Sequence, residues 1–233
     1  MSRIEVQLIG GTGTEAVKLA PVALAMRAAG LLAPQFTVVG EHFRVITRAL
    51  AAFDLAPGVT IDADPLTDLI RRLDMIWTER RPAAVMVHGD SRTSLAAALA
   101  AAWRKIPVVH LYAGLREDEF ETPATDEANG RLIAQVATLH LVPVPLAAMN
   151  LIDEGVAARS VLITGDTGFD AALVIASRRL PSSRVTTANP YADGLAGQRA
   201  AQAVAALLGL ADQPAPMPIP SFTGAAGAMR FGA

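Results

Sequence analysis

The chain has 233 residues, of which 52% are hydrophobic and 18% charged; this excludes a disordered protein and allows one sizeable α/β core or two small ones. A formal net charge of −2 gives no electrostatic reason to expect binding to nucleic acid or to an anionic membrane. The absence of cysteine excludes disulfides, thiolate nucleophiles and cysteine-ligated metals. The first residues lack a signal-peptide pattern, and the longest apolar run, near 94–103, is too short to cross a bilayer, so we expect a cytoplasmic protein.

Short β-branched segments alternate with Ala- and Leu-rich amphipathic segments along most of the chain. In chain order, the apolar runs predict strands at 4–9, 36–39, 59–62, 84–88, 107–111, 139–142 and 161–164. Helices are expected between them at 14–29, 43–53, 64–80, 93–103 and 125–136, and after each of the last two strands. Asp64 and Pro65 suit the start of the third helix, because Asp caps free N–H groups and Pro is tolerated in a first turn.

Strands that are apolar on both faces, each followed by a helix, indicate a mostly parallel sheet with helices on both faces. Right-handed crossovers then give a doubly wound, Rossmann-like α/β fold in a single domain. We expect this domain at 1–180, a linker at 181–188, and a C-terminal helix within 189–210 that packs back on the domain.

The segment 211–233 is rich in Pro, Gly and Ala and is expected to be an extended tail. Apolar side chains are placed among its small residues, and they predict that the tail packs on the domain surface or on a neighbouring protomer. These side chains are Met217, Ile219, Phe222, Met229 and Phe231.

Polar residues cluster where five of the predicted strands end, at 10–14, 40–42, 88–91, 110–112 and 164–167. The carboxyl ends of parallel strands meet at one edge of the sheet, and ligand crevices of doubly wound folds lie there. Strand ends are also polar simply because they emerge into water. Since the pattern repeats at five ends, we favour a small-molecule site.

Six motifs follow one another along the chain: GTGTEAVKLAP from Gly11, VHGDS from Val87, IPVVHLYAGLR from Ile106, DEAN from Asp126, TGDT from Thr164 and NPYADG from Asn189. In sequence, order and spacing they resemble the motifs GTRPEAIKxAP, V(H/Q)GDT, IPVxHVEAGLR, PEExNR, TGNT and NPYGDG. These are the motifs of the non-hydrolysing UDP-N-acetylglucosamine 2-epimerases. The resemblance covers about residues 3–175 and 188–209 and implies the Rossmann-like first domain of that family.

The resemblance also implies that most of a second domain is missing. Family members have two Rossmann-like domains with the active site between them, whereas this chain passes from near Ser177 directly to the C-terminal helix. The family reaction removes the proton at C2, expels UDP and returns the proton to the glycal. Gly13, Tyr112 and Gly130 stand where the family has Arg, Glu and Arg, and Asp126 replaces a Glu. Each such loss costs a factor of about 10², so we expect no ordinary epimerase activity.

The strand ends and the resemblance together give the candidate site. The candidate acid and base groups are Asp90, His110, Tyr112, Asp126 and Glu127. The candidate ligand- or anion-binding residues are Gly11, Gly13, Lys18, His42, His88, Arg116 and Asp166. Tyr112 is either a titrating group or an aromatic that fills the space left by Glu. His88, Asp90 and His110 could suggest a metal pair, but the family match accounts for all three without metal.

Three functions remain open at this point. The first is a repurposed enzyme of isomerase or lyase type that does acid/base chemistry on a small-molecule or sugar-derived substrate. The second is a non-catalytic binding or partner subunit. The third is an NAD(P)-dependent enzyme, because Gly11-x-Gly13-x-x-Ala16 after a strand is also a dinucleotide fingerprint, with Glu41 as the ribose-binding acid. We favour the first, with no cofactor, and we expect a homodimer through first-domain helices as in the related enzymes.

Overall fold

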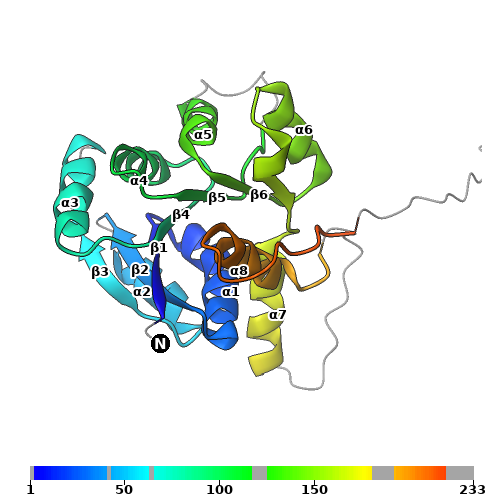
Figure 1. Cartoon of the computed structure of the whole chain (residues 1–233). Coiled ribbons are helices and arrows are strands. Elements are labelled where there is room, and N and C mark those ends of the chain that lie inside the picture. The colour runs from blue at the N-terminus through cyan, green and yellow to red at the C-terminus, as the bar shows by residue number, and fades with distance from the viewer. Residues whose placement is uncertain (1–2, 41–42, 63–65, 117–124, 180–191, 219–233) are drawn as a thin grey trace, which may run out of the picture.

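The computed structural model describes residues 3–40, 43–62, 66–116, 125–179 and 192–218 (Figure 1). Its centre is a sheet of seven strands in the order β3-β2-β1-β4-β5-β6-β7, and every neighbouring pair is parallel. This confirms the doubly wound α/β prediction. The strands are β1 Ile4–Gly10, β2 Leu32–Val39, β3 Pro57–Ile61, β4 Ala84–His88, β5 Val108–Leu111, β6 Leu139–Val142 and β7 Val161–Ile163.

Helices follow the strands as the alternation of the sequence predicts. They are α1 Gly13–Ala29, α2 Phe43–Ala51, α3 Leu66–Glu79, α4 Arg92–Trp103, α5 Thr125–Val136, α6 Pro145–Asp153, α7 Thr167–Arg179 and α8 Ala196–Leu207. The predicted capping pair Asp64 and Pro65 lies outside the described residues.

Two strands begin earlier than predicted: β3 starts at Pro57 instead of 59, and β2 shows the larger difference. β2 starts at Leu32 although Pro34 lacks an N–H group, and the sequence had placed its start at 36. The register explains this, because β2 pairs with β1 from Leu32 onward, whereas β3 joins only from Phe36. Pro34 therefore lies in a stretch of β2 with a single neighbouring strand, where a missing donor is tolerated.

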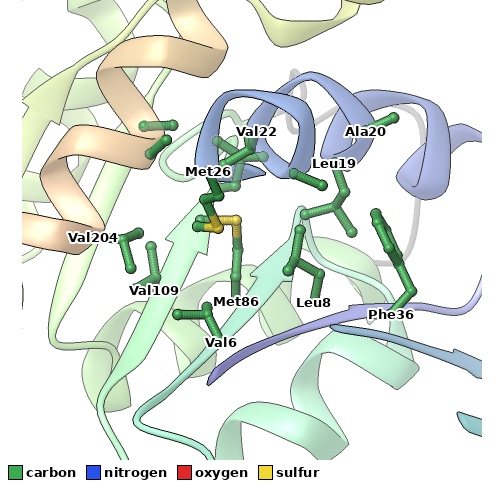
Figure 2. Packing of buried hydrophobic residues seen from close by; sticks show 14 of the residues in the cluster. Val6, Leu8, Leu19, Ala20, Val22, Met26, Phe36, Met86, Val109 and Val204 are labelled. Carbon is green, nitrogen blue, oxygen red and sulfur yellow. The ribbon is translucent and has the colours of Figure 1, made fainter. Parts of the chain in front are cut away.

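Two layers of helices cover the sheet (Figure 1). α1, α2, α7 and α8 cover one face, and α3, α4 and α5 cover the other. Figure 2 shows the first layer, in which Leu8 and Met86 of the sheet meet Leu19 and Met26 of α1. Both faces are covered, and a polar side chain buried within the sheet finds its partners there: Gln7 Oε1 accepts hydrogen bonds from Trp77 Nε1 at 2.8 Å and from Thr37 Oγ1 at 3.4 Å.

The C-terminal helix packs on the first helix of the chain. A side chain at Gly197 would place its Cβ 2.9 Å from the backbone of Pro21, so glycine permits the close approach of α8 to α1. Beyond α8, the described chain continues to residue 218, where Met217 is buried and its N–H donates to the Ile163 carbonyl of edge strand β7 at 2.8 Å. The linker 181–188 and the tail residues Ile219, Phe222, Met229 and Phe231 lie outside the described residues.

Candidate functional site

A crevice of about 530 Å³ lies at the carboxyl ends of β4 and β5, between the first turns of α1, α4 and α5. This is the edge at which doubly wound folds bind their ligands. Of the predicted site residues, those that line it are Lys18, His88, Asp90, His110, Tyr112, Arg116, Asp126 and Glu127. Gly11, Gly13 and Asp166 lie beside this set rather than in the lining, and His42 is outside the described residues.

Tyr112 stands at the centre of the crevice. It follows β5 with a φ of 65°, a left-handed conformation that turns the chain sharply at the strand end. The Lys18 ammonium lies over its ring, 3.7 Å from the centroid, and the His88 ring stacks on it with 5.0 Å between the centroids. The hydroxyl hydrogen-bonds to Asp166, and burial together with that carboxylate raises the pKa of Tyr112. The phenol therefore stays protonated at neutral pH and is a donor, not a base.

The two histidines of the crevice are neutral. Burial lowers the pKa of both His88 and His110 to about 3, and nearby positive or imidazole groups add to the effect. His110 Nε2 lies 2.7 Å from the Gly89 carbonyl oxygen, so a neutral ring donates its proton there. Its Nδ1 and the His88 Nε2 are buried and have no partner within the described part of the chain. Both histidines thus line the crevice without adding charge to it.

The loop between β1 and α1 is held by an internal carboxylate. Gly11 and Thr12 donate their N–H groups to Glu15 Oε2 at 2.6 and 3.2 Å, and Thr12 Oγ1 accepts the Glu15 N–H at 3.1 Å. This is a capping box, and burial raises the pKa of Glu15. The Gly11 N–H, which was predicted to bind an anion, therefore already has a partner. The spacing Thr12-x-x-Glu15 is the sequence signature of such a box and marks the start of α1.

Two charged residues that line the crevice, Arg116 and Glu127, are held in ion pairs. Arg116 makes a bidentate pair with Glu154 at 2.8 and 2.6 Å, which holds the pKa of Glu154 below its usual range. Glu127 accepts from Arg131 at 2.6 Å, one turn along α5. No motif pointed to Glu154, because it comes from the end of α6 and meets Arg116 only through the fold. The pairing fixes the Arg116 guanidinium at the rim.

Asp90 lies against α5. A Cβ at Gly130 would be 3.3 Å from the Asp90 Cβ and 3.7 Å from Arg116 Nη1, so the glycine allows this close approach. Asp166 reaches the crevice from the start of α7, where its Oδ1 accepts the Gly168 N–H at 2.7 Å. A Cβ at Gly168 would lie 3.5 Å from Lys18 Cε, which places Asp166 and Lys18 side by side. The part of the chain that is described holds no cluster of three or more metal-ligating side chains.

Comparisons with known proteins agree with this architecture. The family model described as UDP-N-acetylglucosamine 2-epimerase matches residues 37–186. UDP-N-acetylglucosamine 2-epimerase of Bacillus subtilis is 32% identical over 179 residues, which cover 73% of this chain and 47% of that protein. The enzyme of the same name from Escherichia coli K12 is 32% identical, with coverages of 78% and 50%.

Solved structures give the same result. The structure of UDP-GlcNAc 2-epimerase from Neisseria meningitidis bound to UDP-GlcNAc has a TM-score of 0.71 and 30% identity, and covers 77% of this chain and 51% of that one. None of the described helices is long and apolar enough to cross a membrane. The chain spans about half the length of the relatives that it matches. Since the family model matches more than half of its residues, the chain belongs to the UDP-N-acetylglucosamine 2-epimerase family.

Proposed function

We propose that this chain does acid/base chemistry, of isomerase or lyase type, on a sugar-derived or other small-molecule substrate, and that it is not a UDP-N-acetylglucosamine 2-epimerase by itself. The observation that carries the proposal is the crevice. Lys18, Asp90 and Arg116 line one cavity of about 530 Å³ together with the carboxylates of α5. Carboxylates beside fixed cations and neutral imidazoles are suited to proton transfer on a bound anion.

Within this proposal the groups have separate roles. Asp90, Asp126 and Glu127 are the proton-transferring candidates, because the raised pKa of Tyr112 makes its phenol a weak acid and the lowered pKa of both histidines makes their imidazoles weak bases. Lys18 and Arg116 supply positive charge, and burial lowers the pKa of Lys18, which makes its proton easier to move. His88 and His110 line the crevice without adding charge, and His110 positions the Gly89–Asp90 turn through the Gly89 carbonyl.

The proposed departure from epimerase activity rests on the replaced motif residues and on the short stretch between α7 and α8. The relatives are about twice as long, and we propose that residues 181–188 stand in the place of their second domain. The boundaries 1–180, 189–210 and 211–233 remain part of this proposal. Tyr112 also fills the position of a family Glu with a ring that contacts the Lys18 ammonium and stacks on His88.

A deuterium-exchange experiment tests the proposal. The purified chain is incubated in D₂O with UDP-N-acetylglucosamine, UDP-N-acetylmannosamine or N-acetylmannosamine, and the proton at C2 is followed by ¹H NMR. We expect no interconversion of the two UDP-sugars. Exchange of the carbon-bound proton on one of these sugars, abolished in Asp90→Asn, supports acid/base chemistry. Interconversion at an ordinary enzyme turnover would overturn the proposal.

A second candidate is the non-catalytic binding or partner subunit, favoured by the Lys18–Tyr112–His88 stack that fills part of the crevice. In the same NMR samples, saturation transfer to a sugar without any proton exchange would support this second function. The NAD(P) interpretation gains no support, because the Gly11 and Thr12 N–H groups that would bind a pyrophosphate donate to Glu15.

We also propose that the chain is a homodimer. Leu146, Met149 and Ile152 lie on one side of α6 and are 64%, 58% and 46% exposed. Apolar side chains at this spacing form a stripe along a helix, and such a stripe is usually covered by protein. The cytoplasmic location stays a prediction from the sequence.

A further inference from the structure

A second cavity, of about 660 Å³, lies between α1, α7 and α8 and shares no lining residue with the crevice. Its walls are Leu24 and Met26 of α1, Leu173 and Val174 of α7, and small residues of α8 such as Ala201. The volume is typical of ligand pockets, and the lining is mostly apolar with few polar groups, as in sites that bind small molecules.

Among the described residues that line this cavity, Asp170 is the only charged one. Its side chain is 6% exposed. Oδ2 accepts the N–H of Gly197, near the start of α8, at 2.7 Å, whereas Oδ1 is buried and has no partner among the residues that the structure describes. Leaving a buried carboxylate oxygen unpaired is unfavourable, so a native site normally supplies a donor.

The charges around Asp170 favour a cation as that donor. Asp193 and Asp166 both act on Asp170 as like charges, and burial together with them raises its pKa to about 6. The nearby cation, Arg199, is already used, because it pairs with Asp193 at 3.0 and 2.5 Å and donates to the Thr164 carbonyl at 3.1 Å. The field at Oδ1 is therefore negative, and a positively charged hydrogen-bond donor would relieve it.

We propose that this cavity binds a small-molecule amine whose apolar body lies against Leu24, Leu173 and Val174 and whose ammonium pairs with the carboxylate of Asp170. Asp170 selects the charged end, and the apolar walls hold the rest of the molecule. This site is separate from the crevice and does not depend on the function proposed for it.

The test compares three probes of equal chain length: n-octylammonium, n-octanol and n-octanoate. Binding to the full chain is measured by titration calorimetry, and the Gly197 amide is followed by ¹H–¹⁵N NMR. We expect n-octylammonium to bind at least about tenfold more tightly than n-octanol, and n-octanoate not to bind. Equal binding of the amine and the alcohol, or no binding of either, would overturn the proposal.

Two variants separate the charge from the cavity. Asp170→Asn retains a side-chain oxygen for the Gly197 N–H, and it should weaken n-octylammonium about tenfold while leaving n-octanol unchanged. Ala28→Trp places a large side chain from an exposed cavity residue into the space, and should weaken both probes while Asp170 is intact. Asp153→Asn, an exposed carboxylate of α6, is the matched control and should change neither.

The pH dependence gives an independent arm. Because the ammonium prefers ionised Asp170, affinity for n-octylammonium should fall as the pH is lowered from 7.5 to 5, through the pKa of about 6. Asp166, Asp193 and Arg199 surround the group, so Asp170→Asn is measured over the same range. An amine affinity that keeps its pH dependence in Asp170→Asn contradicts the assignment.

Discussion

At the scale of single residues, the loop after β1 contains two nearby glycines, and only one of them is required by packing. A Cβ at Gly11 would lie 2.4 Å from Thr93 Oγ1 and 2.8 Å from Thr93 Cβ, at the start of α4. A Cβ at Gly13 would meet only Val45 Cγ1, at 3.5 Å. The first glycine is required by the contact between α4 and the loop, and the second is not.

This difference predicts opposite outcomes for two matched substitutions. Gly11→Ala should lower the free energy of unfolding by about 1–3 kcal/mol, because the added methyl group forces Thr93 and the loop apart. Gly13→Ala should change it by less than about 0.5 kcal/mol or stabilise the first turn of α1. Urea unfolding of both variants decides the matter, and equal effects at the two positions would contradict the packing argument.

The buried histidines predict acid sensitivity. Their folded pKa of about 3 lies below the unfolded value of 6.5, so below pH 6.5 the unfolded chain binds more protons than the folded one. Stability is therefore lost as the pH falls from 6.5 toward 3, by up to about 1.4 kcal/mol per pH unit for each histidine. Asp170 acts in the opposite sense, since its raised pKa favours the folded state at lower pH.

A difference measurement isolates one histidine from these opposing groups. Urea unfolding of the wild type and of His110→Gln at pH 7, 6 and 5 should give curves that converge as the pH falls, because the variant lacks one buried imidazole that must stay neutral. A constant difference across the range would show that His110 titrates normally in the folded protein.

At the scale of elements, the chain after α8 protects the edge of the sheet. β7 has β6 on one side, and on its other side Met217 donates its N–H to the Ile163 carbonyl. The Met217 side chain is 3% exposed, so this short segment contributes burial as well as a hydrogen bond. An exposed edge strand is a template for aggregation, which the segment counters.

Replacing Met217 tests this function of the segment. Met217→Ala should lower the free energy of unfolding by about 2 kcal/mol or more, because a buried side chain is removed. Met75→Ala is the matched control: Met75 is 57% exposed on α3, and its loss should cost well under 1 kcal/mol. Similar losses at both positions in chemical denaturation would mean that the segment does not pack on β7.

The bounds of the helices and strands show how much of the secondary structure the sequence predicts. The bounds of β4, β6 and α5 agree with the prediction, because an apolar run or an amphipathic period marks each of them clearly. The predicted start of β2, at 36, was wrong. Pro34 is tolerated within β2 because only β1 pairs with that part of the strand. Local pattern carries no information on how many neighbours a strand has.

The candidate site was only partly predictable for the same reason. Motifs placed Lys18 in the helix after the first strand and Asp90 and Tyr112 directly after two neighbouring strands, and the structure brings the three together. The Lys18–Tyr112–His88 stack and the Arg116–Glu154 pair depend on side-chain geometry between distant elements. Nothing in the spacing of residues 116 and 154 indicates that they touch.

At the scale of the whole molecule, the proposed homodimer gives a direct prediction. Sedimentation of the purified chain at micromolar concentration should show twice the mass of one chain. If the α6 stripe forms the interface, Met149→Glu should produce monomers, because a buried charge without a partner is costly. Arg27→Glu, which changes a charge on α1 instead, is the control. A monomeric wild type would count against the dimer.

The packing of α8 on α1 has a consequence for how this architecture can be divided. Residues 167–179 and 196–207 both rest on the first helix, so the core is completed by chain from either side of the stretch that joins them. An insertion between α7 and α8 would therefore leave the packing of both helices on α1 in place. A module can be gained or lost at this position while the core of the domain is kept.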